Sequence, residues 1–434
     1  MNNETQYLAS YNLGKLSHVR GRIGWKGLKS HEYTEEGPYL IAGTHIKGDK
    51  IQWDECQHIN QFRYDESPEI KLNVNDIIIS KDGTIGRIAL IDSLPGPTTI
   101  NSTMMLVRLK NQDVLCSEFI FYFLQGEKFK KLVAERVAGS GVPHLFQADM
   151  KTLTVLAPSI EKQQKIAKVM NTIDNFIDLT QNLIDKYTAV KQGMMADLFS
   201  RGIDLSGTPE TNKSYGQLRP SYEEAPELYQ ETELGWIPKD WEIQRVEDIL
   251  DRVIDYRGKT PNKTGDGIPL ITAKNVRFGY IDPEPREYIA AEDYDVWMTR
   301  GIPNQGDVLF TTEAPLANVA QLDTQSKVAF AQRMIILQSS LKCDSSFLKY
   351  LLMSDNFRRA IFSRGSGSTV EGVKQSEFKK VKVCLPKHNC EQLKIVEVID
   401  SLSEKIVNEE VIIEKYTNIK KGLMQDLLTG KVKV

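Results

Sequence analysis

The chain lacks several features that would place it in a membrane or an oxidising compartment. No apolar run approaches the roughly 18–20 residues needed to span a bilayer. The five cysteines are odd in number and show no CxxC spacing, which favours a reduced compartment. The N-terminal Met-Asn-Asn-Glu-Thr-Gln has neither the basic nor the apolar region of a signal peptide. We therefore expect a cytoplasmic protein with no membrane association.

Motifs for catalysis and metal binding are also missing from the sequence. There is no G-x-x-x-x-G-K-[ST] loop for ATP phosphates. There is no Asn/Asp-Pro-Pro-aromatic segment of the kind that amino-methyltransferases use to hold a flipped base. Cys384, His388 and Cys390 match no common zinc spacing. We expect no catalytic residues, no metal site and no cofactor in this chain.

The chain has little excess of charge of either sign. Its formal net charge is −3, which argues against a protein that coats DNA through bulk basicity. A specific DNA binder that concentrates Lys and Arg locally is not excluded, because the surface facing the phosphates decides binding. A length of 434 residues predicts several domains, since one core rarely grows past about 250–300 residues.

The chain does contain one apolar pattern that occurs twice in the sequence. A ladder of alternating four- and three-residue steps recurs after 229 positions (395 − 166). The first copy is Ile166, Met170, Ile173, Ile177, Ile184, Tyr187, Met194 and Leu198, and the second is Ile395, Ile399, Leu402, Ile406, Ile413, Tyr416, Leu423 and Leu427. The polar breaks coincide as well, Thr180 with Glu409 and Lys191 with Lys420. A duplicated protein with internal pseudo-twofold symmetry follows.

Each ladder predicts a long helix with a seam for a partner helix. Val169, Phe176, Leu183 and Val190 recur every seven residues and widen the apolar stripe. Each helix could instead pack onto its own domain. We favour an antiparallel intramolecular pair, because an internal twofold relates the two copies. The shared polar breaks are expected either to set the register of the pair or to open a docking point for a partner.

The remaining sequence divides into two globular halves of mixed α/β (α+β) class. In the first half, Tyr39–Ala42, Asp76–Ser80, Ile88–Ile91 and Met104–Leu109 are strand-length apolar runs, whereas Phe119–Leu124 and Phe129–Val133 look helical. Pro158 and Pro386 break the chain before the two helices. The predicted boundaries are 1–157 for the first domain, 158–200 for the first helix, 201–235 for a linker, 236–386 for the second domain and 387–434 for the second helix and tail.

The two globular halves also align, although more loosely than the helices. Glu36-Gly-Pro-Tyr-Leu-Ile matches Asp266-Gly-Ile-Pro-Leu-Ile, and Asn75-Asp-Ile-Ile-Ile-Ser matches Gly306-Asp-Val-Leu-Phe-Thr. Trp25-Lys26 matches Tyr256-Arg257, a pairing that could be a shared phosphate clamp or simply a structural turn. Two domains with one skeleton and different surfaces are what a two-part reader requires.

Several ordered motifs make the chain resemble the specificity subunit of Type I restriction–modification enzymes over nearly its whole length. They are Leu234-Gly-Trp-Ile-Pro-Lys-Asp-Trp-Glu-Ile, Tyr256-Arg-Gly-Lys-Thr-Pro, Leu156-Ala-Pro followed by Glu161–Ile166, and Lys421-Gly-Leu-Met-Gln-Asp-Leu-Leu-Thr-Gly-Lys-Val. The first half lacks the Ile-Pro-Lys-Asp-Trp opening of the second half. We therefore expect the extreme N-terminus to be organised differently.

The resemblance implies two target-recognition domains separated by a helical spacer, each reading half of a bipartite site on double-stranded DNA. It further implies docking of two methyltransferase subunits and of two restriction/translocase subunits. S-adenosylmethionine, ATP and magnesium would then belong to those partner subunits. The alternative is a non-catalytic helical scaffold or adaptor without sequence-specific DNA binding.

Polar side chains near predicted loops are the candidates for DNA contact, because phosphate contacts set the register and Arg, Asn or Gln read bases. In the first domain these are Lys26, Lys29, His45, Lys47, Lys81, Arg87, Asn101, Ser140 and His144. In the second domain they are Arg257, Lys259, Lys274, Asn275, Arg277, Thr312, Gln332, Arg333 and Lys374.

Overall fold

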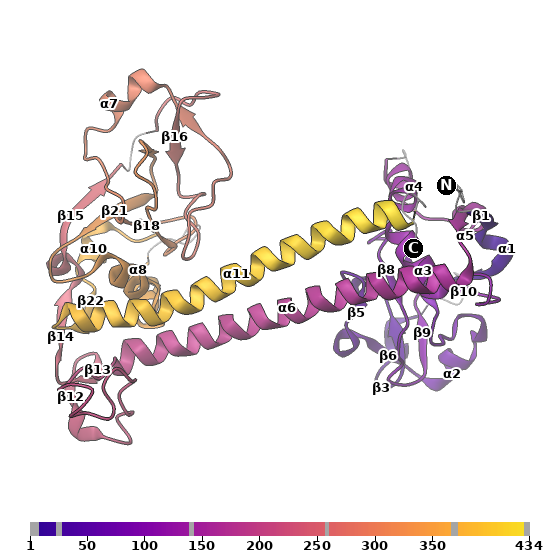
Figure 1. Ribbon diagram of the computed structural model, residues 1–434, viewed down its shortest axis with the longest axis horizontal. Coiled ribbons are helices and arrows are strands. Elements are labelled where there is room, and N and C mark those ends of the chain that lie inside the picture. The colour runs from indigo at the N-terminus through magenta and orange to yellow at the C-terminus, as the bar shows by residue number, and fades with distance from the viewer. Residues whose placement is uncertain (1–7, 23–27, 139–142, 257–259, 366–371, 429–434) are drawn as a thin grey trace, which may run out of the picture. The chain divides into compact units, whose positions relative to one another are not determined.

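The computed structural model describes residues 8–22, 28–138, 143–256, 260–365 and 372–428. The chain divides into two compact units, one of residues 1–182 with 410–434 and the other of residues 183–409. Each unit contains one globular domain and a section of both long helices, α6 (Ile160–Arg201) and α11 (Asn389–Leu427) (Figure 1). We describe each unit by itself.

The first unit is built on a four-stranded antiparallel sheet in the order β2-β10-β7-β8, formed by Ser17–Arg20, Met104–Leu109, Ile77–Ser80 and Ile88–Leu90. A second sheet, β6-β3-β9, consists of Gln57–Ile59, Tyr33–Ile41 and Thr98–Ile100, and β3 runs parallel to β9. Two shorter pairs are β1-β11 (Ala9–Asn12, Thr154–Ala157) and β4-β5 (Ile46–Lys47, Lys50–Ile51). The helices of this domain are α1 (Leu13–Leu16), α2 (Gln61–Asp65), α3 (Ser117–Gln125), α4 (Glu127–Val137) and α5 (Gln147–Thr152).

The second unit repeats the four-stranded and the three-stranded sheet of the first unit strand for strand. Its four-stranded sheet, β15-β21-β18-β19, consists of Leu250–Asp255, Met334–Ser339, Val308–Thr311 and Val319–Gln321. Its three-stranded sheet, β17-β16-β20, consists of Tyr288–Ile289, Ile268–Ile271 and Ala329–Phe330, with β16 parallel to β20. The shorter pairs are β14-β22 (Trp241–Arg245, Lys382–Pro386) and β12-β13 (Tyr229–Thr232, Gly235–Pro238). The helices are α7 (Tyr294–Trp297), α8 (Ser345–Met353), α9 (Asp355–Phe362) and α10 (Gln375–Lys379).

One pair of glycines shows how closely the two backbones correspond. Gly37 and Gly267 precede β-paired segments at matching places and have φ angles of +131° and +126°. A Cβ atom there would lie 2.7 Å from the carbonyl oxygen of Ile59 and 2.2 Å from that of Ile289. Glycine is required at both positions, because the backbone passes too close to the neighbouring strand for any side chain.

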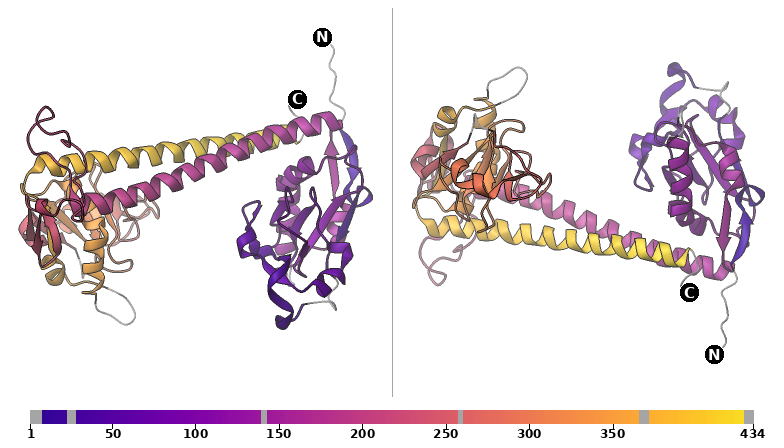
Figure 2. Two further views of the ribbon diagram at one scale, coloured as in Figure 1. Left: turned by 90° about the horizontal axis from the view of Figure 1, so that it is seen from below. Right: turned by 90° about the horizontal axis from the view of Figure 1, so that it is seen from above.

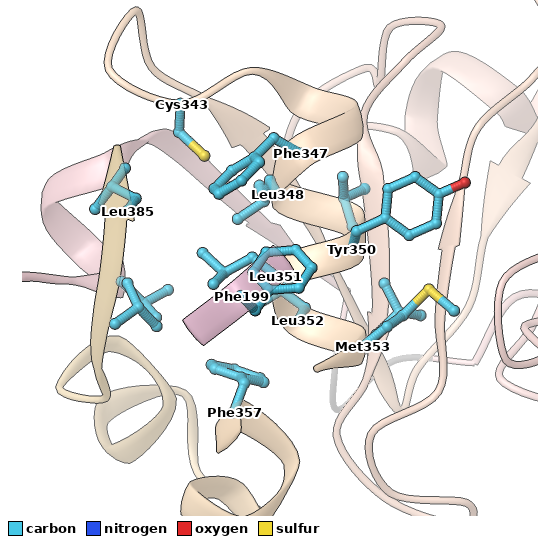
Figure 3. Packing of buried hydrophobic residues seen from close by; sticks show 14 of the residues in the cluster. Phe199, Cys343, Phe347, Leu348, Tyr350, Leu351, Leu352, Met353, Phe357 and Leu385 are labelled. Atoms are coloured by element: carbon cyan, nitrogen blue, oxygen red, sulfur yellow. The ribbon is translucent and has the colours of Figure 1, made fainter. Parts of the chain in front are cut away.

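Each domain core receives the last turn of a long helix from the other repeat. In the second unit, Phe199 of α6 lies among the side chains of α8, with its ring centroid 5.4 Å from that of Phe347 (Figure 3). In the first unit, Leu427 of α11 and the following Leu428 join the core that contains Phe119 of α3. The apolar ends of both ladders are therefore buried by a globular domain.

The long helices pair antiparallel, as the duplicated ladder predicted. In the first unit, Phe176 stacks on Tyr416 with ring centroids 5.4 Å apart, and Asp174 meets Lys420 at 2.6 Å. In the second unit, Lys405 lies over the ring of Tyr187 at 5.9 Å. Residue numbers fall on one helix as they rise on the other, and the views in Figure 2 agree that the two helices lie side by side.

All sixteen ladder residues are buried or half-buried, but they are not buried by the same elements. Ile166, Met170 and Leu427 belong to the core of the first unit, and Leu198, Ile395 and Ile399 to that of the second. The alternative, a helix packed onto its own domain, therefore describes only the first turns of each helix, since Leu198 and Leu427 at the other ends pack onto the domain of the other repeat. Of the residues predicted to widen the apolar stripe, Val169, Phe176 and Val190 are exposed and Leu183 is half-buried.

The segment interpreted as a linker, 201–235, is folded onto the second unit. Ile203 is buried in its core, and Arg219 is 6% exposed. Glu391 at the start of α11 accepts hydrogen bonds from the backbone N–H of Ile203 at 3.0 Å and from Trp241 Nε1 at 3.0 Å, and it pairs with Arg219. The apolar residues of this segment show no periodicity, because isolated contacts such as those of Ile203 and Arg219, rather than one face of a helix, fix the segment on the domain.

The predicted strands and helices occur close to their expected positions. Met104–Leu109 is β10, and the runs at 76–80 and 88–91 become β7 and β8 with one residue trimmed from each. The predicted helix Glu161–Leu198 is Ile160–Arg201, and Cys390–Leu428 is Asn389–Leu427.

Candidate nucleic-acid interface

Two of the predicted DNA-contact residues of the first domain converge at the turn between β7 and β8. We call Ser80, Lys81, Asp82, Thr103 and His144 the first turn site. The backbone N–H of Lys81 donates to the carbonyl of Thr103 at 2.8 Å, and the carbonyl of Lys81 accepts from the N–H of Leu145 at 3.0 Å. These bonds bring three distant segments together. The imidazole Nδ1 of His144 is thereby placed in hydrogen-bonding contact with Asp82 Oδ1.

The second domain contains the same arrangement between β18 and β19. We call Thr311, Thr312, Glu313, Arg333 and Val373 the second turn site. The N–H of Thr312 donates to the carbonyl of Arg333 at 3.0 Å, and the carbonyl of Thr312 accepts from the N–H of Val373 at 2.9 Å. Arg333 Nε lies 3.8 Å from Glu313 Oε1. Asp82 and Glu313 therefore occupy the same place in the two domains and each lies beside a basic side chain. The basic residues come from different places, because Arg333 stands where the first turn site has Thr103, whereas His144 precedes Leu145, the counterpart of Val373.

The hydroxyl at the start of each turn holds the turn closed. Ser80 Oγ accepts from the N–H of Arg87 at 2.9 Å, and Thr311 Oγ1 accepts from the N–H of Asn318 at 2.9 Å. Both hydroxyl residues are fully buried, so they build the frame of the site and are not available to a ligand.

His45 and Asn275, both predicted DNA contacts, are instead equivalent structural residues. His45 Nδ1 accepts from the N–H of Ala42 at 3.1 Å, and Asn275 Oδ1 accepts from the N–H of Thr272 at 2.9 Å. They are 7% and 4% exposed. Burial lowers the pKa of His45, because the imidazolium would lose its hydration. These two side chains fix turns beneath the surface.

Arg87 is exposed, and its guanidinium also anchors the backbone of the domain. Its Nη1 donates to the carbonyls of Gly43 at 3.2 Å and Ile46 at 2.9 Å. Asn318, its counterpart, donates from Nδ2 to the carbonyl of Val276 at 2.9 Å. Both side chains attach the end of the turn to backbone that follows β3 in the first domain and β16 in the second.

The other candidates lie outside the turn sites or only line them. Asn101 Oδ1 accepts from Thr103 at 2.7 Å and so supports the first turn site from below. Lys29 and Lys47 are exposed, and Lys47 pairs with Glu55. In the second domain Lys274 and Lys374 are exposed, Gln332 is half-buried, and Arg277 pairs with Asp282 at 3.1 Å. Lys26, Ser140, Arg257 and Lys259 lie outside the described residues.

Sequence reasoning missed the acidic member of each pair. Asp82 and Glu313 were overlooked because a carboxylate is not an obvious partner for DNA. The signal that could have found them is the repeat itself, since both acids fall two residues after the strand that ends in Ser80 or Thr311.

One of the two shared polar breaks of the ladder, Lys191 with Lys420, contacts the globular domains. Lys420 of α11 lies over the ring of Tyr122 at 5.7 Å and pairs with Asp174, and the Tyr122 hydroxyl donates to Asp174 Oδ2 at 2.7 Å. Lys191 of α6 lies over the ring of Tyr350 at 5.8 Å. Burial, followed by the charge of Lys349, lowers the pKa of Lys191. These lysines are therefore intramolecular contacts between each helix and the domain of the other repeat.

Nothing in the described part of the chain points to a bound metal. No group of three or more His, Cys, Asp or Glu side chains there could hold an ion. Among the same residues, none of the helices is both long and apolar enough to cross a bilayer.

Comparison with known proteins agrees with the internal repeat. The family model described as Type I restriction modification DNA specificity domain matches twice, at residues 12–188 and 238–417. The MjaVIII specificity subunit of Methanocaldococcus jannaschii is 26% identical over 407 residues, which cover 92% of this chain and 87% of that protein.

Solved structures share the fold at low sequence identity. The S subunit of a Type I restriction–modification system from M. genitalium matches with a TM-score of 0.58 and 14% identity, covering 98% of this chain and 97% of that one. A chain from work on complex assembly and conformational transition of the type I R-M system matches with a TM-score of 0.55 and 15% identity, covering 97% of each. With both halves matched by one model, the chain belongs to the Type I restriction–modification DNA specificity family and carries the family's domain twice.

Proposed function

We propose that this chain is the DNA-recognition subunit of a Type I restriction–modification complex, in which each domain reads one half of a bipartite site. The observation that carries the proposal is the pair of turn sites, which share one backbone frame and differ in side chains. A symmetric reader would carry identical side chains on both frames. Different side chains on equal frames suit two different half-sites.

The complex would supply all of the catalysis through other subunits. Two methyltransferase subunits would dock on this chain, two restriction/translocase subunits would complete the assembly, and their S-adenosylmethionine, ATP and magnesium would be bound outside this chain. Such a complex would work in the cytoplasm, where the DNA is.

Apolar side chains on the outer surfaces of the long helices support this docking. In the first unit, Leu179 of α6 is 65% exposed and Val411 of α11 is 59% exposed. In the second unit, Val407 of α11 is 55% exposed. Apolar side chains recurring along a helix face are suited to a partner helix.

Exchange of residues 10–157 for those of a relative with a different target tests the assignment of half-sites. The chimera and the natural chain, each with the methyltransferase partner, are compared by footprinting and by mapping of methylated adenines. We expect one half-site to change and the other to remain. A change in both half-sites would contradict the two-reader model.

The salt dependence of binding separates this function from that of an adaptor without DNA recognition. Contacts to phosphates release counterions, so the affinity for DNA should fall steeply between low and physiological salt. Protection of no site, or equal protection of all sequences, would favour the adaptor.

A further inference from the structure

The two turn sites can be compared position by position, because the same backbone bonds hold both. Lys81 and Thr312 occupy one position, with the same donor and acceptor bonds on either side. Asp82 and Glu313 follow, and Gly83 and Gly86 correspond to Ala314 and Ala317, which share their positive φ angles. The backbone is constant between the domains while the chemistry of the exposed side chains is not.

Exposure separates the frame from the side chains that can meet a ligand. In the first turn site the side chains of Asp82 and His144 are 35% and 30% exposed. In the second, those of Glu313 and Arg333 are 43% and 54% exposed. The hydroxyls of Ser80 and Thr311 are buried, so the acid–base pairs are what each frame presents to solvent.

In and beside the second turn site, three residues other than glycine adopt an unfavourable backbone conformation. Ala314, Ala317 and Arg333 have φ angles of 44°, 64° and 74°, in the left-handed region that residues other than glycine seldom adopt. Three such residues in one site are held there by the surrounding bonds, a feature that clusters at functional sites.

We propose that Asp82–His144 and Glu313–Arg333 are the base-reading pairs of the two domains, an inference that rests on the proposed DNA-recognition function. In each pair the carboxylate lies beside the basic group, and both side chains are partly exposed to solvent. The pairs differ in the position and the chemistry of the basic residue, so they select different bases in the two half-sites.

In the first domain, His144 Nδ1 is hydrogen bonded to Asp82 Oδ1. In the tautomer whose Nδ1–H donates this bond, Nε2 is unprotonated and accepts a hydrogen bond. The other carboxylate oxygen of Asp82, Oδ2, lies 3.9 Å from Lys81 Nζ and is shared with that lysine. This pair therefore suits an exocyclic amino group in the major groove, on adenine N6 or cytosine N4.

In the second domain, the guanidinium of Arg333 offers only donors. Its Nε lies 3.8 Å from Glu313 Oε1, and its side chain is 54% exposed. Two parallel donors match O6 and N7 of guanine, which is the commonest specific contact of arginine in the major groove. This pair therefore suits a guanine.

The test measures base preference with the full chain in complex with its methyltransferase partner. The variants are Arg333→Ala and His144→Ala, and each is presented with a DNA library randomised at one position of the target at a time. We expect Arg333→Ala to reduce discrimination about 5- to 150-fold at one guanine of one half-site. His144→Ala should relax one adenine or cytosine position of the other half-site.

Matched controls separate base reading from general charge and from folding. Arg286→Ala removes an arginine of the second domain that is 65% exposed and pairs with Glu284, and Lys110→Gln removes an exposed lysine of the first domain that follows the far end of β10. Both should leave the preference at every base unchanged. Thermal unfolding of each variant shows whether its domain is intact, and Glu313→Gln repeats the test with a smaller change.

The outcomes distinguish the inference from the function beneath it. Folded Arg333→Ala and His144→Ala variants that bind DNA with unaltered preference at all positions would overturn the inference and leave the proposed function standing. A natural complex that shows no sequence preference would overturn the proposed function itself.

Discussion

Replacement of Glu391 by leucine should detach the segment before the second domain. Glu391 is 4% exposed and its carboxylate accepts hydrogen bonds from Ile203 N–H, Trp241 Nε1 and both terminal nitrogens of Arg219. The Glu391→Leu variant leaves the buried guanidinium of Arg219 without its principal counter-charge. Breaking one partner out of a buried ion pair costs about 3–5 kcal/mol.

The second carboxylate near Arg219 does not rescue the variant. Asp240 also pairs with Arg219, but its side chain is 48% exposed, and a pair with an exposed partner contributes about 0–1 kcal/mol. The loss of the acceptor for Trp241 Nε1 adds about 1–3 kcal/mol. We therefore expect a loss of at least about 3 kcal/mol in the unfolding free energy of the second unit.

Urea unfolding of the full chain measures this loss, together with limited proteolysis between residues 203 and 239. With a slope of about 1–3 kcal/mol per molar urea, the midpoint of the affected transition should fall by about 1 M or more. Cleavage in the segment should accelerate before global unfolding, because its anchor has gone. Glu233→Gln is the control, since it removes the exposed pair with Lys382 and should cost less than about 1 kcal/mol.

A double variant distinguishes an unpaired charge from simple loss of packing. Arg219→Met combined with Glu391→Leu removes both charges, and such replacements are often neutral. We expect the double variant to be more stable than Glu391→Leu alone, although below the natural chain because Trp241 Nε1 and Ile203 N–H still lack an acceptor. Additive losses from the two substitutions, or a cost of Glu391→Leu no larger than the control, would refute the reasoning.

Three further predictions follow from buried groups. Burial lowers the pKa of His45 below its ordinary 6.5, so the stability that its neutral form contributes is present above that pH and is lost as the pH falls. The His45→Asn variant keeps an acceptor for the N–H of Ala42 but does not titrate. In urea titrations it should therefore lose less stability than the natural chain between about pH 7.5 and about pH 5. Gln163 and Gln392 are fully buried at matching places and bond three backbone groups each, so leucine at either should cost about 1–3 kcal/mol, and thermal unfolding should show the two losses in different units. Gly267→Ala should strongly destabilise the second unit, because its Cβ would lie 2.2 Å from the carbonyl oxygen of Ile289. Gly193→Ala in the interior of α6, where a Cβ would have no atom within 4 Å, should stabilise by about 0.5–1 kcal/mol. Equal effects of the two variants on the midpoint of thermal unfolding would contradict the assigned conformations.

The long helices were predictable from sequence because their signal is local and repeated. Side chains three and four residues apart share a helix face, so the spacing of residues such as Ile166 and Met170 predicts the helix that contains them. The pairing of β3 with β9 was not predictable, since the parallel register depends on segments far apart in the chain. The same holds for His144 and Asp82, which are 62 residues apart and meet only when the domain folds.

The folded linker shows a different limit of sequence reasoning. Gly, Pro, Ser and Glu dominate the segment, and composition alone favours a flexible chain. Its position is fixed by Arg219 and Glu391, which are 172 residues apart. A single buried ion pair leaves no periodic trace, so a segment held by isolated anchors looks the same in sequence as one that is held by none.

The division of labour inside each turn site explains how such a domain can change its specificity without losing its fold. Lys81 and Thr312 differ in charge and size, yet the bonds that position them come from their backbone atoms, which every residue possesses. The groups that close the turn are the hydroxyls of Ser80 and Thr311, which are buried and chemically alike. Side chains presented to solvent therefore contribute little to the frame, and substitution there costs little stability. A reader built in this way can exchange its base contacts one residue at a time while the sheets and the helix ends that enter its core stay unchanged.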